Sequence, residues 1–216
     1  MPEAYKQRLK ELREKAKTNV EHGTIFYTNG TRDDRVGSPN GGTVDLSWKR
    51  YKTVDMVVHN HTKRASVGSD QPLSISCFSA TDIGALHKMI TEPETKLSPN
   101  FIFMVIHDEA TYIVQIDDLS KFIESDFYNM RFDFIKMQEQ RLQSDVEEHE
   151  RFGSNFEPPI DEFSREGFVG LFAQYGISLL RSTNNRDFTE EDKWHHITIE
   201  QPNPRDNRNL INPCKK

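Results

Sequence analysis

Residues 55–61 read DMVVHNH, and this stretch indicates more about the fold than any other part of the chain. Its apolar centre, bounded by polar residues, predicts a buried strand that leaves the core where His59 and His61 lie. Side chains two residues apart in a strand project from the same face, with Cα atoms about 6 to 7 Å apart. Two such imidazoles can bind one zinc ion through bonds of about 2.0 to 2.1 Å. The stretch therefore predicts a central strand that ends in a candidate metal-binding pair.

Further strands are expected on both sides of this one. Short runs of β-branched and aromatic residues between turn residues favour strands. Asn29-Gly30, after the first run, is a strong hairpin signal, and a polar turn at residues 107–109 would join two later strands as another hairpin. The expected strands cover residues 23–28, 43–46, 101–106, 111–116 and 178–181.

Helices are indicated where apolar residues recur at three- and four-residue spacing. The first covers residues 2–19, with many basic residues on its other faces. The second covers residues 79–90 and would begin at Ser79 as its N-cap. A long helix at residues 119–150 carries an apolar stripe, for which we expect core packing in preference to binding a partner helix. A shorter helix is expected at residues 160–175.

The composition is that of a globular chain, because 35% of its 216 residues are hydrophobic. Its net charge of −6 argues against a general affinity for nucleic acid. No stretch approaches the roughly 20 apolar residues of a membrane span, and the N-terminus has no apolar segment typical of a signal peptide. Two cysteines are too few for a disulfide framework. We therefore expect a cytoplasmic protein with neither nucleic-acid nor membrane partners.

These elements predict an α/β (α+β) fold with a mixed central sheet flanked by helices. Residues 1–118 would form the core, and residues 119–200 a helical extension that packs on it. Residues 201–216 are rich in Asn, Pro and Arg, and we expect this tail to be disordered.

Asp82 is the best candidate for a third metal ligand. It lies in the first turn of the helix at residues 79–90, where the helix dipole favours a carboxylate. Two histidines, one aspartate and a water molecule would make an open zinc site of the catalytic type. Each part also has a simpler interpretation, since histidine pairs at strand ends are common and Ser79-x-x-Asp82 resembles a capping box. The order of strand, histidine pair, loop and capped helix favours the metal site.

His107, His149 and the pair at residues 195–196 have no partner at ligand spacing, and we interpret them as ordinary polar residues.

The segments VVHNHT and FSATDI resemble the motif of the JAMM (MPN-type) zinc metalloproteases, in particular of bacterial and phage members. That motif consists of an upstream Glu, then His-x-His, then Ser-x-x-Asp. The resemblance covers about residues 19–116 and implies a JAMM/MPN-like (cytidine-deaminase-like) fold. The chain departs from the motif in a longer loop before Ser79, which costs little stability, and in Thr62, where bacterial members commonly have proline.

The resemblance also implies a role for each site residue. His59, His61 and Asp82 would hold Zn²⁺, and Ser79 would help to stabilise the tetrahedral intermediate. Glu21, which directly precedes the first expected strand, would be the general base. The implied reaction is hydrolysis of a peptide or isopeptide bond in a protein or peptide substrate, and the loop at residues 62–77 would border the groove for that substrate.

Three other classes of function were weighed against this one. An amidohydrolase barrel can also begin with His-x-His but typically needs about 250 residues or more. The letters HNH do not indicate an HNH nuclease, in which they are dispersed through a ββα unit. The serious alternative is a catalytically silent MPN-like binding or scaffold module, for example of a phage or mobile element. Against it, a scaffold has no need of the complete ligand set.

Overall fold

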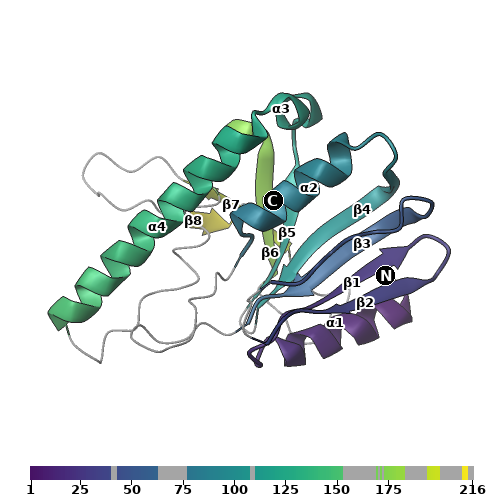
Figure 1. The fold of residues 1–216 in the computed structure, drawn as a ribbon, viewed down its shortest axis with the longest axis horizontal. Helices are drawn as coiled ribbons and strands as arrows, with labels where there is room; N and C mark the ends of the chain where they lie inside the picture. The colour runs from purple at the N-terminus through teal and green to yellow at the C-terminus, as the bar shows by residue number, and fades with distance from the viewer. Residues whose placement is uncertain are drawn as a thin grey trace.

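A computed structural model describes residues 1–39, 43–62, 77–107, 110–152, 169, 171, 173–182, 194–199 and 211–213. These residues form one eight-stranded sheet, in the spatial order β2-β1-β3-β4-β5-β6-β7-β8 (Figure 1). The strands are β1 (His22–Tyr27), β2 (Arg32–Val36), β3 (Thr53–Asn60), β4 (Lys96–Ile106), β5 (Thr111–Ile116), β6 (Ile177–Ser182), β7 (Trp194–Ile199) and β8 (Ile211–Pro213). The helices are α1 (Glu3–Lys15), α2 (Ala80–Thr91), α3 (Leu119–Glu124) and α4 (Phe127–Phe152), with a 3-10 turn, η1 (Ala173–Tyr175).

The sheet is mixed because β3 and β4 run parallel, whereas all other neighbouring strands in it are antiparallel. Parallel neighbours need a crossover connection, and here that connection includes α2. As a result, β3 and β4 end at the same edge of the sheet, where Asn60 pairs with Ile106.

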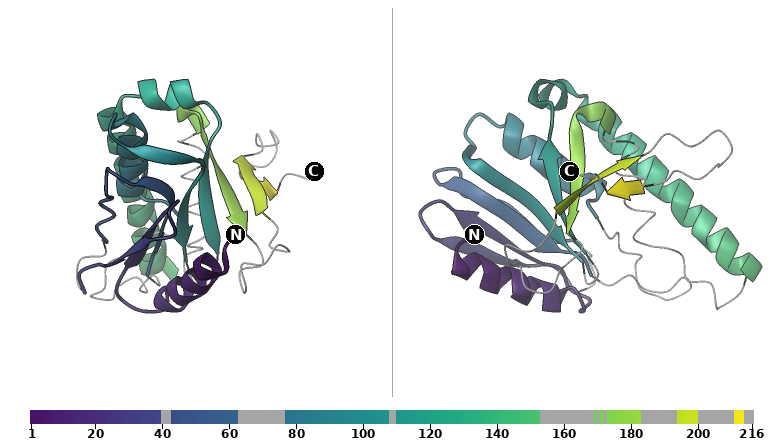
Figure 2. Two further views of the ribbon diagram at one scale, coloured as in Figure 1. Left: turned by 90° about the vertical axis from the view of Figure 1, so that its right-hand side faces the viewer. Right: turned by 180° about the vertical axis from the view of Figure 1, so that it is seen from behind.

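Helices cover both faces of this sheet (Figure 2). Helix α1 packs on β1, β3 and β4 from one side. Helix α2 packs on the opposite face, with α3 and α4 beside it. The structure confirms the expected architecture, a mixed sheet with helices on its faces.

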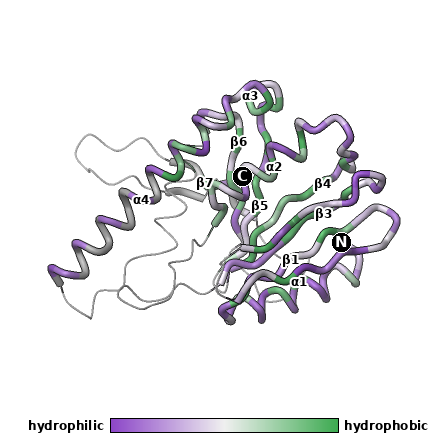
Figure 3. Tube along the Cα trace, viewed as in Figure 1, coloured by the Kyte–Doolittle hydropathy of each residue, from purple (hydrophilic) through white to green (hydrophobic). Residues whose placement is uncertain are grey.

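Two hydrophobic clusters follow from the alternation of side chains along the strands. Met56 and Val58 of β3 belong to the cluster under α1, whereas Val57 belongs to the cluster under α2. Figure 3 shows apolar residues along β4, and polar residues alternating with apolar ones on α1. By the same alternation, His59 and His61 lie on the α2 side.

Several sequence-based expectations are confirmed. The strand at residues 23–28 is β1, and Gly30 in the turn after it has φ of 81°, which glycine adopts without strain. The two strands predicted at residues 101–106 and 111–116 pair as an antiparallel hairpin. The strand predicted at residues 178–181 is β6. Helix α2 begins after Ser79, as expected.

The single helix expected at residues 119–150 is wrong, because two helices occupy this range. Ser125 is extended, with ψ of 134°, and the Asp126 side chain accepts hydrogen bonds from the backbone N–H groups of Tyr128 and Asn129. Asp126 therefore caps a new helix. The apolar stripe does reach the core, since Phe122, Met130 and Phe134 are buried.

Strand β2 was not predicted. Its sequence, RDDRV, carries charge at four of five positions, and an edge strand that faces solvent tolerates this composition. The strand expected at residues 43–46 is not part of the sheet.

Strands continue the same sheet beyond residue 118. Strands β6 and β7 fall within the expected helical extension, and β8 falls within the expected tail. The helix expected at residues 160–175 lies mostly outside the described residues. Within the described parts of the chain, no helix is long and apolar enough to cross a membrane.

Candidate metal centre

The candidate site lies where β3 ends against the start of α2. His59 is the second-last residue of β3, and the backbone N–H of His61 donates to the carbonyl of Ile106 on β4 at 2.9 Å. Asp82 comes from the first turn of α2. The three side chains are almost fully buried, with 1%, 4% and 7% exposure for His59, His61 and Asp82. Three polar groups are thus held together out of contact with solvent.

The ligand atoms converge closely. His59 Nε2 lies 3.0 Å from His61 Nε2 and 3.0 Å from Asp82 Oδ1, and His61 Nε2 lies 3.3 Å from Asp82 Oδ2. In a tetrahedral zinc site with bonds of about 2.0 to 2.1 Å, neighbouring ligand atoms are about 3.3 Å apart. Two facing imidazole nitrogens can share only one proton in an N–H···N bond, whereas a cation between them can accept a lone pair from each nitrogen. The spacing and the donor types therefore fit a zinc ion held by these residues.

Ser79 fixes the carboxylate of Asp82. Its backbone N–H and its hydroxyl donate to Asp82 Oδ2 at 2.6 and 2.7 Å. In return the backbone N–H of Asp82 donates to the Ser79 hydroxyl oxygen at 3.2 Å, which completes a capping box. Both Ser79 donors are directed to one carboxylate oxygen, while Oδ1 faces His59. The bonds that begin α2 also orient a candidate metal ligand.

The histidines determine the charge state of Asp82. Burial alone would raise the pKa of its carboxyl group, but the charge of His59 and hydrogen bonds from His59 and His61 lower that pKa well below its usual value. The carboxylate is therefore ionised and anionic, as a metal ligand must be.

Glu21 lies in the same electrostatic environment. It is 7% exposed and directly precedes β1, in which Gly23 pairs with His59. Burial raises the pKa of its carboxyl group, an effect that the charges of His61 and His59 oppose and that of Asp82 reinforces. The backbone N–H of Val44 also donates to this carboxylate. All five residues singled out from the sequence thus gather at one end of β3.

Gly23 allows the chain to pack tightly beside the site. A Cβ atom at this position would lie 2.6 Å from Leu46 Cδ2 and 3.5 Å from the Cβ atom of His59. Leu46 therefore occupies the space that a side chain on β1 would fill. The contact between Gly23 and Leu46 keeps the segment around Leu46 beside β1. That segment includes Val44, whose backbone N–H is the partner of Glu21.

Two polar residues near the site were not recognised from the sequence. Asn60, between the histidines, faces the other side of the sheet, and its Oδ1 accepts a hydrogen bond from the backbone N–H of His22 at 2.8 Å. His107 follows β4 directly and is 3% exposed. Asn60 has no pattern of its own that marks it, and only the pairing of β3 with β4, which are distant in sequence, brings His107 to the same edge as His61.

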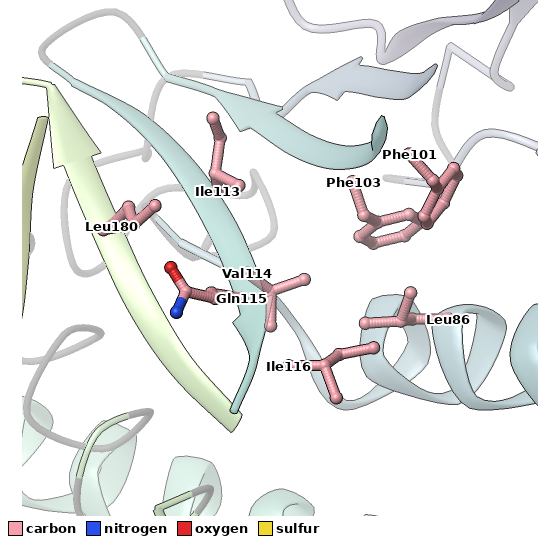
Figure 4. Close-up of a pocket in the computed structure, with 8 residues that line it drawn as sticks. All are labelled: Leu86, Phe101, Phe103, Ile113, Val114, Gln115, Ile116 and Leu180. Carbon is pink, nitrogen blue, oxygen red and sulfur yellow. The ribbon is translucent and has the colours of Figure 1, made fainter. Parts of the chain in front are cut away.

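An apolar pocket of about 310 Å³ lies elsewhere, where β4 and β5 separate (Figure 4). Its walls come from α2, β4, β5 and β6, and none of the five site residues lines it. The lining residues are Leu86, Phe101, Phe103, Ile113, Val114, Gln115, Ile116 and Leu180.

Comparison of the chain with models of protein families, with curated proteins and with solved structures found no match. The case for a function therefore depends on the geometry of the site.

Replacing Ser79 with alanine should weaken both helix α2 and metal binding. We expect the free energy of unfolding to fall by about 1 kcal/mol through loss of the cap. Zinc affinity should fall about 10- to 100-fold because Asp82 loses the partners that orient it. Urea denaturation of the metal-free protein and zinc titration against a competing chelator measure the two effects.

Asp118→Ala is the matched control, because Asp118 caps α3 by accepting from the backbone N–H of Lys121 at 3.0 Å. This variant should lose similar stability and keep the zinc affinity of the parent. Equal zinc affinities for Ser79→Ala and the parent would show that the capping box does not support a metal site.

The raised pKa of Glu21 predicts a pH dependence of stability in the metal-free protein. The folded state favours the protonated carboxyl, so its stabilising effect is complete below the ordinary pKa of about 4.3 and is lost as pH rises through the raised value. Relative to Glu21→Gln, the parent should therefore become less stable between pH 4 and pH 7. Urea denaturation of both proteins across this range, with a chelator present, measures the difference.

Glu11→Gln serves as the control with opposite sign. The hydrogen bond from Arg8 lowers the pKa of Glu11, so the parent should gain stability over this variant as pH rises toward the ordinary pKa of about 4.3 and change little above it. A Glu21→Gln difference that does not change with pH would mean that Glu21 is not buried beside the site.

Proposed function

We propose that the protein is a zinc-dependent hydrolase of the JAMM type, with a JAMM/MPN-like fold, that cleaves peptide or isopeptide bonds. The observation that carries the proposal is the buried cluster of His59, His61 and Asp82, whose ligand atoms all lie within 4.8 Å of one another. A buried carboxylate and two buried imidazoles are costly to place in a core unless they have partners. A bound cation would give all three such a partner.

The types of ligand favour zinc. Imidazole nitrogens and one carboxylate oxygen suit Zn²⁺ better than Mg²⁺ or Ca²⁺, which prefer oxygen ligands. Three protein ligands leave a fourth position open, as in catalytic zinc sites. When bound, zinc supplies a Lewis acid that polarises a carbonyl group and activates water.

The protein's own residues would complete the reaction. Glu21 would accept a proton from the attacking water and deliver it to the leaving amine. Its raised pKa suits both steps because it brings the carboxyl closer to neutral pH. The hydrogen bond from Val44 would hold the carboxylate in place, and Ser79 would keep Asp82 oriented.

Metal analysis of the purified protein beside His59→Ala, His61→Ala and Asp82→Ala tests the proposal. We expect about one zinc per chain in the parent and almost none in the three variants, since a site with three protein ligands cannot spare one. His196→Ala, in β7, should keep its zinc. A parent without stoichiometric zinc would defeat the proposal.

Peptide and isopeptide libraries then separate the hydrolase from a silent binding module. The zinc-loaded parent should cleave at least one library member, and Glu21→Gln should retain zinc but cleave about 10²- to 10⁴-fold more slowly. Zinc without any cleavage would favour the MPN-like binding or scaffold module.

A further inference from the structure

The hydrogen bonds of Ser79 raise a question about the proposed reaction. In amide hydrolysis the carbonyl oxygen gains negative charge as water adds, and a hydrogen-bond donor beside the zinc would stabilise that charge further. The JAMM resemblance gives this role to Ser79. A serine hydroxyl has only one proton to donate, and that of Ser79 is directed to Asp82 Oδ2 at 2.7 Å, as is its backbone N–H at 2.6 Å. Another group is needed to bind the carbonyl oxygen.

His107 has the position for this role. His59 pairs with Val105 and Asn60 pairs with Ile106 in the parallel register of β3 and β4. His61 and His107 are the next residues on each strand, and neighbouring strands lie about 4.8 Å apart. The two histidines therefore follow neighbouring strands at the same edge of the sheet.

His107 also lies on the correct face of the sheet. Phe103 and Val105 of β4 belong to the cluster under α2, and alternation places His107 on that side with His59 and His61. Its position is fixed, because its backbone N–H donates to the carbonyl of Ala110 at 2.9 Å. At 3% exposure its imidazole is as buried as those of the candidate ligands.

His107 lies at the same edge and on the same face of the sheet as the metal cluster, and it does not belong to that cluster. Among the residues that the structure describes, the group that could hold a metal ion consists of His59, His61 and Asp82. An imidazole beside this group is placed to contact what the metal binds.

We propose that His107 donates a hydrogen bond from its imidazole to the carbonyl oxygen of the scissile amide, in the role that the resemblance gives to Ser79. This assignment rests on the proposed hydrolase function. The hydrogen bond stabilises the charge on that oxygen as the C–O double bond becomes single, and no proton moves to or from His107. The same contact binds any small carbonyl or hydroxamate ligand of the zinc.

Tyr112 is the competing donor. It is fully buried on the same face, since Val105 pairs with both His59 and Tyr112. Its hydroxyl has no hydrogen-bond partner within the described parts of the chain. It lies one strand farther from the cluster than His107, so His107 is the better placed of the two.

Binding of acetohydroxamate to the zinc-loaded protein tests the assignment without a known substrate. Calorimetric titration should show affinity reduced roughly tenfold or more in His107→Ala, the loss expected for one hydrogen bond to a charged group. Zinc content should stay at the level of the parent. His107→Gln, which keeps an N–H donor, should recover part of the affinity, whereas Tyr112→Phe and His196→Ala should bind as the parent does.

Two results would overturn the assignment alone. One is a zinc-loaded His107→Ala variant that binds acetohydroxamate like the parent. The other is the reverse pattern, in which Tyr112→Phe loses affinity and His107→Ala does not. Loss of zinc from both His107 variants would also overturn it, because His107 would then support the metal directly. A parent that holds no zinc overturns the proposed function and this assignment together.

Discussion

The reciprocal hydrogen bonds between Ser79 and Asp82 are the interaction on which the site depends. They begin helix α2 and, with the same atoms, direct the Asp82 carboxylate toward the two histidines. Helix α2 is also the crossover that makes β3 and β4 parallel. A single local contact therefore links the topology of the sheet to the geometry of the candidate metal centre.

The cost of burying polar groups explains why this geometry is informative. Isolated buried charges destabilise a fold, and buried polar groups are normally satisfied by partners. At the end of β3 the chain buries a carboxylate beside two imidazoles, with a second carboxylate, Glu21, close by. Apolar side chains of the same shape would cost less free energy to bury. Binding of a cation gives a physical reason for this concentration of polar groups.

The sequence alone predicted the parts of the fold that depend on local patterns. The apolar run before His59, the cap at Ser79 and the hairpin of β4 and β5 all have short-range signals, and the structure has each of them. Strand β2 was missed because its charged residues match no strand pattern. The break before α4 was missed because the apolar stripe continues across Ser125 and Asp126.

The site residues likewise divide into those with a local sequence signal and those without one. His59, His61, Ser79 and Asp82 could be chosen from spacing, since each pair is close in sequence. Glu21 was chosen by its place in the motif, and the antiparallel pairing of β1 with β3 brings it near His61. His107 could not be chosen, because only the parallel register of β3 and β4 puts it beside His61. Contacts between distant strands decide what sequence spacing does not show.

X-ray absorption at the zinc edge of the purified protein tests the central claim most directly. A site built from His59, His61 and Asp82 predicts only nitrogen and oxygen neighbours, at about 2.0 to 2.1 Å, with outer-shell scattering from two imidazoles. Sulfur neighbours at about 2.3 Å, or a spectrum without imidazole scattering, would contradict it.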